Sequence, residues 1–274
     1  MLDLLLQVGK VYLSYRLLRT FFAVCQSVFI YFIAPLFYTP NLDKFRTRWT
    51  VVTGCTDGIG KAYTYELARR GINKFVLIGR SAQKLSDVKA YLELTHSCDV
   101  KTFLFDFAKD DYANLRAYVN AIDIGLVVNS VGVGRENLER YGDNTEADSM
   151  IMKSVMSFLS ECIDREYSTI SVQCLTPALV ATNMTYYKKS SLFVVTADSF
   201  AREAVGTIGL VRVTSGCFNH EIQMLIRHLF PWTILKYLVM PIYWLQQRRL
   251  QQHHSVQKKE TVNVPLEKIK RAAA

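Results

Sequence analysis

The sequence predicts an α/β fold, with a doubly wound sheet of parallel strands and helices on both faces. Short apolar runs rich in β-branched residues alternate with helical patterns between residues 49 and 131, as in chains built from βαβ units. A glycine-rich turn joins the first of these runs to the first helical pattern. Half of the 274 residues are apolar, which is enough for a sizeable core and argues against disorder.

Residues 1–39 precede this region and are strongly apolar. The eighteen residues from Phe21 to Tyr38 carry no formal charge, which is close to the length that spans a bilayer. The run is too long for a cleaved signal peptide, and no small-residue cleavage site closes it. We therefore expect a membrane anchor over residues 1–39, followed by a polar linker over 40–48. The alternative is a buried or interfacial helix.

The turn after the first predicted strand has the features of an anion site. Thr50–Val52 is an apolar, β-branched run, and the loop after it carries Gly54, Gly58 and Gly60. Glycines let the backbone approach a pyrophosphate, and the N-terminus of the following helix supplies free N–H groups and positive partial charge. The spacing Thr-Gly-x-x-x-Gly-Ile-Gly differs from the usual dinucleotide fingerprint. The alternative is an ordinary structural turn.

The next elements alternate regularly between strands and helices: Lys74–Ile78, Gln83–Leu94, Val100–Phe105, Asp111–Ala121 and Ile124–Ser130. Arg80 follows the second strand, where enzymes that prefer NAD usually place a carboxylate. A cation there, together with Lys84, suits a ribose 2′-phosphate and favours NADP(H). The alternative is a solvated arginine at the end of a strand.

The stretch VVTGCTDGIGKAY resembles the short-chain dehydrogenase/reductase superfamily, and most closely its membrane-bound 17β-hydroxysteroid dehydrogenase and very-long-chain 3-oxoacyl-CoA reductase branch. The resemblance covers most of residues 10–246. It implies a Rossmann-like sheet over residues 49–221, NADP(H) as cofactor, a keto or hydroxy lipid as substrate, and the endoplasmic reticulum membrane as location. It implies cofactor contacts at Gly54, Thr56, Asp57, Gly58, Ile59, Gly60, Arg80, Lys84, Asp106, Asn129, Gly132, Pro177, Val180 and Thr182.

The family pattern is interrupted at about residues 133–152. The resemblance implies a catalytic serine and a Tyr-x-x-x-Lys pair, but none of the fifteen tyrosines has a lysine four residues later. Only 21 positions separate Gly132 from Lys153, and a parallel crossover alone takes a dozen or more residues. Roughly fifty residues of the pattern, including the fifth strand, are therefore missing. One possibility is that the strand predicted at Ile170–Leu175 pairs directly with the fourth strand.

Lys153 has two interpretations. By resemblance it stands where the lysine of the catalytic pair would begin a helix, although Ser149 takes the place of the tyrosine four residues earlier. Alternatively, it is an ordinary surface lysine on an amphipathic helix over Glu146–Tyr167.

The C-terminal part predicts a second contact with the membrane. Residues 222–245 are apolar and aromatic, but Pro231 and Pro241 interrupt them, which favours an interfacial segment over a clean span. The tail, 246–274, is polar and basic. The net charge of +9 suits an anionic membrane surface, and no nucleic-acid-binding motif accompanies it. The scattered cysteines and histidines predict no metal site.

Three functional hypotheses follow. The chain is an NADP(H)-dependent reductase of 3-oxoacyl-CoA or keto-steroids, or a catalytically inactive relative that still binds NADP(H). The third possibility is that the sequence is a truncated isoform or gene model of an active reductase, because one contiguous block is missing between recognisable flanks. The sequence does not indicate an oligomeric state.

Overall fold

The computed structural model describes residues 2–132 and 160–230, apart from 161, 164, 186, 188, 189 and 192, together with isolated helical positions between 234 and 248. The chain forms two compact units. The first comprises Met1–Val133 and Met150–Leu229, and the second comprises Gly134–Ser149 and Phe230–Ala274. Lys153 and the interruption expected at 133–152 lie outside the described residues. The fold and the site described below belong to the first unit.

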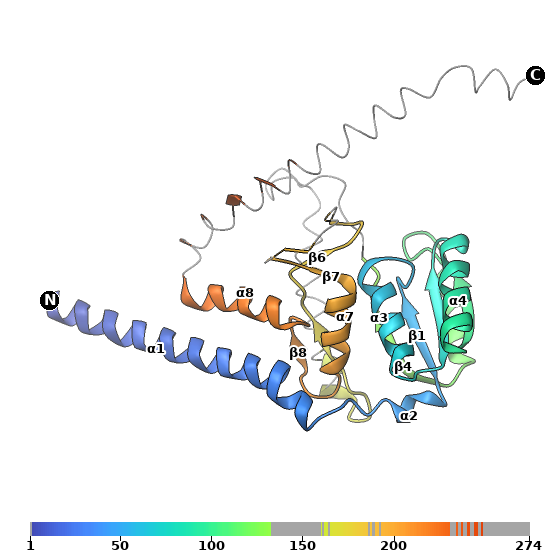
Figure 1. Ribbon diagram of the computed structural model, residues 1–274, viewed down its shortest axis with the longest axis horizontal. Coiled ribbons are helices and arrows are strands. Elements are labelled where there is room, and N and C mark those ends of the chain that lie inside the picture. Colours follow the sequence, from blue (N-terminus) through green and yellow to red (C-terminus); the bar gives the residue numbers. More distant parts are fainter. Residues whose placement is uncertain are drawn as a thin grey trace, which may run out of the picture. The chain divides into compact units, whose positions relative to one another are not determined.

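A four-stranded parallel sheet forms the centre of this unit, in the order β3-β2-β1-β4 (Figure 1). Its strands are β1 (Trp49–Thr53), β2 (Lys74–Gly79), β3 (Asp99–Leu104) and β4 (Ile124–Asn129). The apolar runs of β1 and β2 are buried because they are the inner strands of a sheet that is covered on both faces.

Helices cover the two faces of the sheet, so the fold is doubly wound as predicted. On one face, α3 (Gly58–Arg69) and α4 (Ala82–His96) pack their apolar side chains against alternate residues of the strands. On the other, α5 (Tyr112–Asn120) packs Leu115 and Tyr118 against Val51 and Val76. Because side chains alternate in direction along β1 and β2, successive residues are buried in the two hydrophobic clusters on opposite faces of the sheet.

The second half of the unit carries two short parallel ladders. Strand β5 (Cys174–Leu175) pairs with β8 (Val213–Thr214), and β6 (Leu179–Ala181) pairs with β7 (Val194–Thr196). Helices α7 (Ala197–Gly206) and α8 (Phe218–Leu229) complete it.

The expected direct pairing of the Ile170–Leu175 strand with the fourth strand is wrong for the part of the chain that the structure describes. The strand is shorter than predicted, because the Ile170 amide donates to Tyr167 O in a turn and only Cys174 and Leu175 are extended in a ladder. That ladder is made with β8, whereas β4 pairs with β1.

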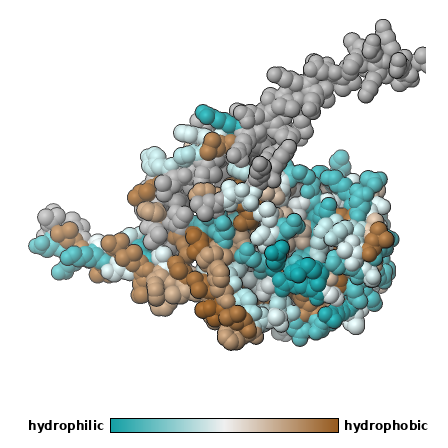
Figure 2. Space-filling view, viewed as in Figure 1, coloured by the Kyte–Doolittle hydropathy of each residue, from teal (hydrophilic) through white to brown (hydrophobic). Residues whose placement is uncertain are grey.

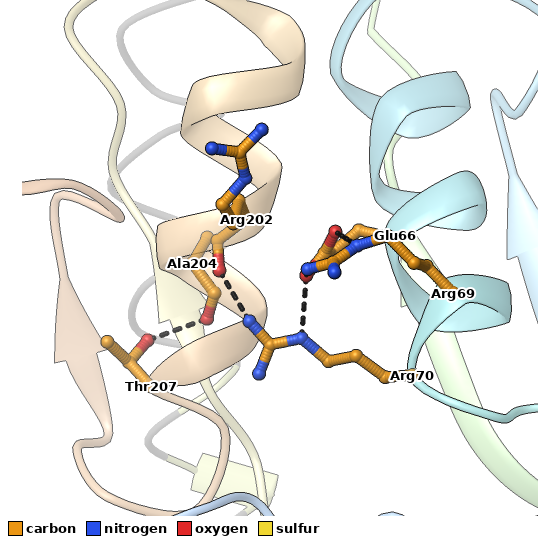
Figure 3. A network of polar contacts seen from close by, with 6 residues as sticks. All are labelled: Glu66, Arg69, Arg70, Arg202, Ala204 and Thr207. Atoms are coloured by element: carbon orange, nitrogen blue, oxygen red, sulfur yellow. Dashed lines mark hydrogen bonds and ion pairs between the residues drawn. The ribbon is translucent and has the colours of Figure 1, made fainter. Parts of the chain in front are cut away.

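Packing between α3 and α7 joins the second half to the sheet (Figure 3). The carboxylate of Glu66, only 7% exposed, accepts hydrogen bonds from Arg69 Nε and Nη2 at 2.8 Å and from Arg70 Nε at 2.6 Å. Arg70 Nη2 then crosses to α7 and donates to Arg202 O at 2.8 Å. Burial alone would raise the pKa of Glu66, but the two guanidinium groups outweigh it and lower that pKa.

The N-terminal residues form one long apolar helix. Helix α1 (Leu2–Val28) continues into a π-helical turn (Phe29–Ile33) and a 3₁₀ turn (Ala34–Leu36). Among the described residues this is the one helix that is long and apolar enough to cross a membrane, over Leu6–Leu36. Figure 2 shows brown, apolar side chains interspersed with polar ones along it. Phe37 at its end is 85% exposed.

The end of this helix is fixed to the second half of the unit, since α1 and α8 are in contact. The rings of Phe32 and Phe218 meet edge to face at 4.7 Å between centroids. Tyr31 Oη and Thr214 Oγ1 share a hydrogen bond of 2.7 Å, and Tyr38 Oη donates to Ile208 O at 2.8 Å. The apolar helix is therefore docked against α8 and its neighbours. Residues 40–48, expected to be a polar linker, contain the short helix α2 (Asp43–Arg46).

Candidate functional site

The glycine-rich loop between β1 and α3 fits against the end of β4. Gly54 has a φ of +67°, and a Cβ there would lie 2.5 Å from Ser130 O. A Cβ at Gly60 would lie 2.3 Å from Gly54 O. Both positions therefore require glycine, because a side chain would collide with backbone atoms. The loop lies at the carboxyl edge of the sheet, where Thr56–Ile59 are half-buried.

The N-terminus of α3 offers amide groups for an anion. Asp57 caps the helix by accepting from Gly58 N at 2.7 Å, and Lys61 N donates to Asp57 O at 3.2 Å. The remaining first-turn amides, those of Ile59 and Gly60, have no acceptor in the described part of the chain. They are placed to donate to a phosphate.

A segment from the second half lies over this loop. We call residues Pro177–Thr185 the strap. Thr182 Cγ2 lies 3.0 Å from where a Cβ of Gly58 would be, and Asn183 Nδ2 donates to Asp57 Oδ2 at 2.7 Å. Thr185 Oγ1 braces the strap internally, donating to Val180 O at 2.6 Å. Thr182, which the resemblance assigned to the cofactor, is thus held at the glycine-rich loop, and Val180, assigned likewise, is buried within the strap.

The two predicted 2′-phosphate cations lie beside the same loop. Lys84 Nζ lies 3.5 Å from Asp57 Oδ2. Arg80 follows β2 directly, is exposed, and forms no ion pair with any residue that the structure describes. The pKa of Asp57 is lowered: burial acts to raise it, but hydrogen bonds from Asn183 and Gly58 and the charge of Lys84 prevail.

The remaining predicted residues follow the neighbouring strands. Asp106 comes after β3, and its Oδ1 accepts from the backbone amide of Ala108 at 3.0 Å. Asn129 ends β4 and its Oδ1 accepts from Thr53 Oγ1 at 3.4 Å. Gly132 lies by the strap, since a Cβ there would be 3.9 Å from Met184 Cε. Half-buried Pro177 begins the strap, and Thr56 Cγ2 would be 3.3 Å from a Cβ at Gly79.

The site thus gathers residues from the ends of four strands and from the strap. Within the described residues the site combines a turn that requires glycine, helix amides without an acceptor, and two nearby cations. A dinucleotide-binding site requires these features. No group of three or more His, Cys, Asp or Glu within the described ranges could hold a metal ion.

Comparisons with known proteins identify the family of this chain. A family model described as short chain dehydrogenase matches residues 48–165. The chain is 30% identical to the very-long-chain 3-oxoacyl-CoA reductase let-767 of Caenorhabditis elegans, with 80% of this chain and 85% of the relative covered. This chain belongs to the short-chain dehydrogenase family. It is also 28% identical to the very-long-chain 3-oxoacyl-CoA reductase of Rattus norvegicus, covering 84% of this chain and 89% of that one.

These alignments also bear on the missing block. The comparison with let-767 runs over 277 positions but uses 80% of this 274-residue chain, which is about 219 residues. Roughly 58 of the 277 aligned positions therefore have no residue of the present chain opposite them. This number is close to the fifty residues estimated from the motifs.

Solved structures show the same fold at low sequence identity. The short-chain dehydrogenase from Sphingobium yanoikuyae, in complex with NADPH, aligns with a TM-score of 0.52 and 19% identity over 61% of this chain and 87% of that chain. The L-sorbose reductase from Gluconobacter frateurii, complexed with NADPH and L-sorbose, aligns with a TM-score of 0.51 and 15% identity over 63% and 96%. Both have the Rossmann-like fold of this family.

Sequence reasoning missed two residues that fix the strap, Asn183 and His220. His220 in α8 is fully buried, with Nδ1 accepting from Ala178 N at 3.3 Å and Nε2 3.1 Å from Leu179 O. Neither residue lies in a recognisable motif, and their partners are 126 and 41–42 positions away. No local signal in the sequence predicts contacts of this kind.

Proposed function

We propose that this chain binds NADP(H) at the carboxyl edge of β1, β2 and β4, with the strap over the glycine-rich loop. The observation that carries the proposal is the β1–α3 turn, where glycine is required and the Ile59 and Gly60 amides have no acceptor among the described residues. Those amides would hold the pyrophosphate. Asp106 and Asn129 would line the adenine and nicotinamide sides.

The 2′-phosphate of NADP(H) would be bound by Arg80, with Lys84 nearby. Arg80 is exposed at the end of β2 without a described ion-pair partner, which leaves its guanidinium available for a phosphate. Lys84 is shared with Asp57, so it would act through charge at longer range. The NADPH complexes of the two structural neighbours support this choice of nucleotide.

The reaction class that we propose is oxidation or reduction of a keto or hydroxy lipid, either a 3-oxoacyl-CoA or a 17-keto or hydroxysteroid. The names of the relatives support the acyl-CoA class. The apolar helix over Leu6–Leu36 supports a membrane location, which we propose to be the endoplasmic reticulum. Residues 222–245 would add an interfacial contact, and 246–274 a basic tail.

The residues of the chain would supply binding and orientation for this chemistry, but the sequence lacks the family's Tyr-x-x-x-Lys proton donor. Bound NADPH supplies a hydride. The sequence contains no Tyr-x-x-x-Lys, so the family's acid–base pair would lack its tyrosine even if Lys153 is its lysine. General acid–base assistance contributes about 10²–10⁴-fold to a rate. This favours a second candidate function, an NADP(H)-binding membrane protein with little or no turnover.

Equilibrium binding tests the proposal. The full-length chain in detergent micelles is titrated with NADPH and, separately, NADH, and the nicotinamide fluorescence is followed. We expect saturable binding of NADPH and weaker binding of NADH. Absence of saturable binding by either nucleotide would overturn the proposal, and equal affinity would remove the role of Arg80.

The truncation hypothesis has a separate test. Trypsin cleavage after Arg140 and Lys153 releases the peptide YGDNTEADSMIMK, which crosses the interruption. Mass spectrometry of native membranes that finds this peptide supports a real shortened chain. Finding only peptides from an inserted segment would show that an active, longer reductase is made instead.

A further inference from the structure

His220 forms hydrogen bonds with the beginning of the strap. It stands near the start of α8, and its side chain is completely buried. Nδ1 accepts from Ala178 N at 3.3 Å, so Nε2 carries the hydrogen and donates to Leu179 O at 3.1 Å. One neutral imidazole thereby satisfies two backbone groups at the beginning of the strap.

The other end of the strap is tied to the glycine-rich loop. Asn183 donates to Asp57 at 2.7 Å, and Thr182 lies against Gly58. Between the two ends, Leu179–Ala181 pairs with β7, and Val180 is buried. The backbone position of Thr182 and Asn183 therefore depends on where His220 anchors Ala178 and Leu179.

We propose that His220 is a positioning residue for the nucleotide site: in its neutral form it holds the strap so that Thr182 and Asn183 stay against the glycine-rich loop. This inference rests on the proposed NADP(H) function. Protonation would place a second N–H against the Ala178 N–H, where an acceptor is needed. The bond to Ala178 would be lost, and the strap would be released at that end.

The surroundings of His220 set the direction of its titration. Burial lowers its pKa from 6.5, and this outweighs the backbone carbonyls of Leu179 and Ser215 and the charge of Glu221, which act to raise it. The held strap is therefore stable above pH 6.5 and is lost as the pH falls through the lowered pKa.

Other ionisable groups near His220 are engaged elsewhere. Glu221 accepts from Thr214 Oγ1 and Ser215 N, both at 2.7 Å. From α7, Glu203 accepts from Phe218 N at 2.8 Å, and the Phe200 ring packs on the imidazole. Burial raises the pKa of the Cys217 thiol to about 12, and Tyr31 bonds to Thr214.

Two isosteric substitutions separate the two hydrogen bonds and remove the titration. His220→Asn keeps an acceptor near the Nδ1 position, and His220→Gln keeps a donor near the Nε2 position. His220→Leu keeps bulk and removes both. His96→Asn, on the far end of α4 and half-exposed, is the matched control.

Two measurements are made on the full-length chain in detergent between pH 5 and 8. Hydrogen–deuterium exchange, corrected for intrinsic rate, reports protection of amides 178–185 without nucleotide. Fluorescence titration reports NADPH affinity. We expect wild-type and His96→Asn protein to lose strap protection and NADPH affinity together as the pH falls below 6.5.

At pH 7.5 we expect His220→Leu to weaken NADPH binding by about tenfold or more, because two hydrogen bonds to the strap are lost. His220→Asn should stay within a fewfold of wild type and lose most of the pH dependence of strap exchange, while its NADPH affinity still follows the 2′-phosphate, whose second pKa is about 6. Unchanged strap exchange in His220→Leu, or wild-type pH dependence of strap exchange in His220→Asn, would overturn the inference.

Failure of the proposed function gives a different pattern. If the wild-type chain binds no NADPH at any pH, both the proposed function and the role of His220 in positioning the nucleotide site are refuted. The exchange experiment still decides whether His220 holds the strap, because it needs no nucleotide.

Discussion

Replacing Glu66 by Gln should weaken the joint between α3 and α7. With no described ladder between β4 and β5, this interface carries much of the attachment of the second half to the sheet. Glu66 accepts three hydrogen bonds from two arginines, and the two arms differ in exposure: Arg69 is 59% exposed and Arg70 is 25% exposed.

The magnitude follows from that difference. An exposed ion pair such as Glu66–Arg69 contributes about 0.2–1 kcal/mol. A charged hydrogen bond in a partly buried place, as with Arg70, contributes about 1.5–3 kcal/mol. We therefore expect Glu66→Gln to lower the free energy of unfolding by roughly 2–4 kcal/mol. For a unit of about 200 residues, each kcal/mol lowers Tm by about 2–4 °C.

The assay is urea and thermal unfolding of the full-length protein in detergent, with Arg69→Ala and Arg70→Ala as matched controls. Arg70→Ala should cost about 2 kcal/mol, and Arg69→Ala less than about 1 kcal/mol. The folded-state pKa of Glu66 is lowered from 4.5, so its contribution is present above pH 4.5 and disappears as the pH falls through the lowered value. The difference between wild type and Glu66→Gln should therefore shrink in acid. An Arg69→Ala variant as unstable as Arg70→Ala would refute this reasoning.

Three further predictions concern the site and the membrane. Gly54→Ala should cost at least about 2 kcal/mol and abolish NADPH binding, because the left-handed backbone is strained and the new Cβ meets Ser130 O; a melting curve like that of wild type would contradict this. Arg80→Glu should weaken NADPH binding by about ten- to a hundredfold and leave NADH binding nearly unchanged; parallel losses in both titrations would exclude a 2′-phosphate contact. Carbonate extraction of membranes from expressing cells should leave the chain in the pellet, because the helix over Leu6–Leu36 is long and apolar enough to cross the bilayer; release into the supernatant would argue for an interfacial helix.

The nucleotide half could be read from the sequence because its signals are local. Strand periodicity and the glycine turn each depend on residues within a few positions. The predicted bounds of β1 to β4 consequently fall within about two residues of those in the structure.

The second half was less predictable because its contacts are distant in sequence. The strand expected from Ile170 begins at Cys174, since a turn takes up the preceding residues. Asn183 and His220 gain their roles from partners in other elements, and the docking of Tyr31 on Thr214 joins residues 183 positions apart. Lys153 lies outside the described residues, so its role stays a prediction.

The most direct test of the account follows bound NADPH after a very-long-chain 3-oxoacyl-CoA is added to the full-length chain in membranes. The account predicts enhanced nicotinamide fluorescence from bound NADPH, which then decays at least about a hundredfold more slowly than with the rat very-long-chain 3-oxoacyl-CoA reductase under the same conditions. Fluorescence that shows no bound NADPH would contradict the retained nucleotide site. Decay as fast as that of the rat enzyme would contradict the loss of the acid–base pair.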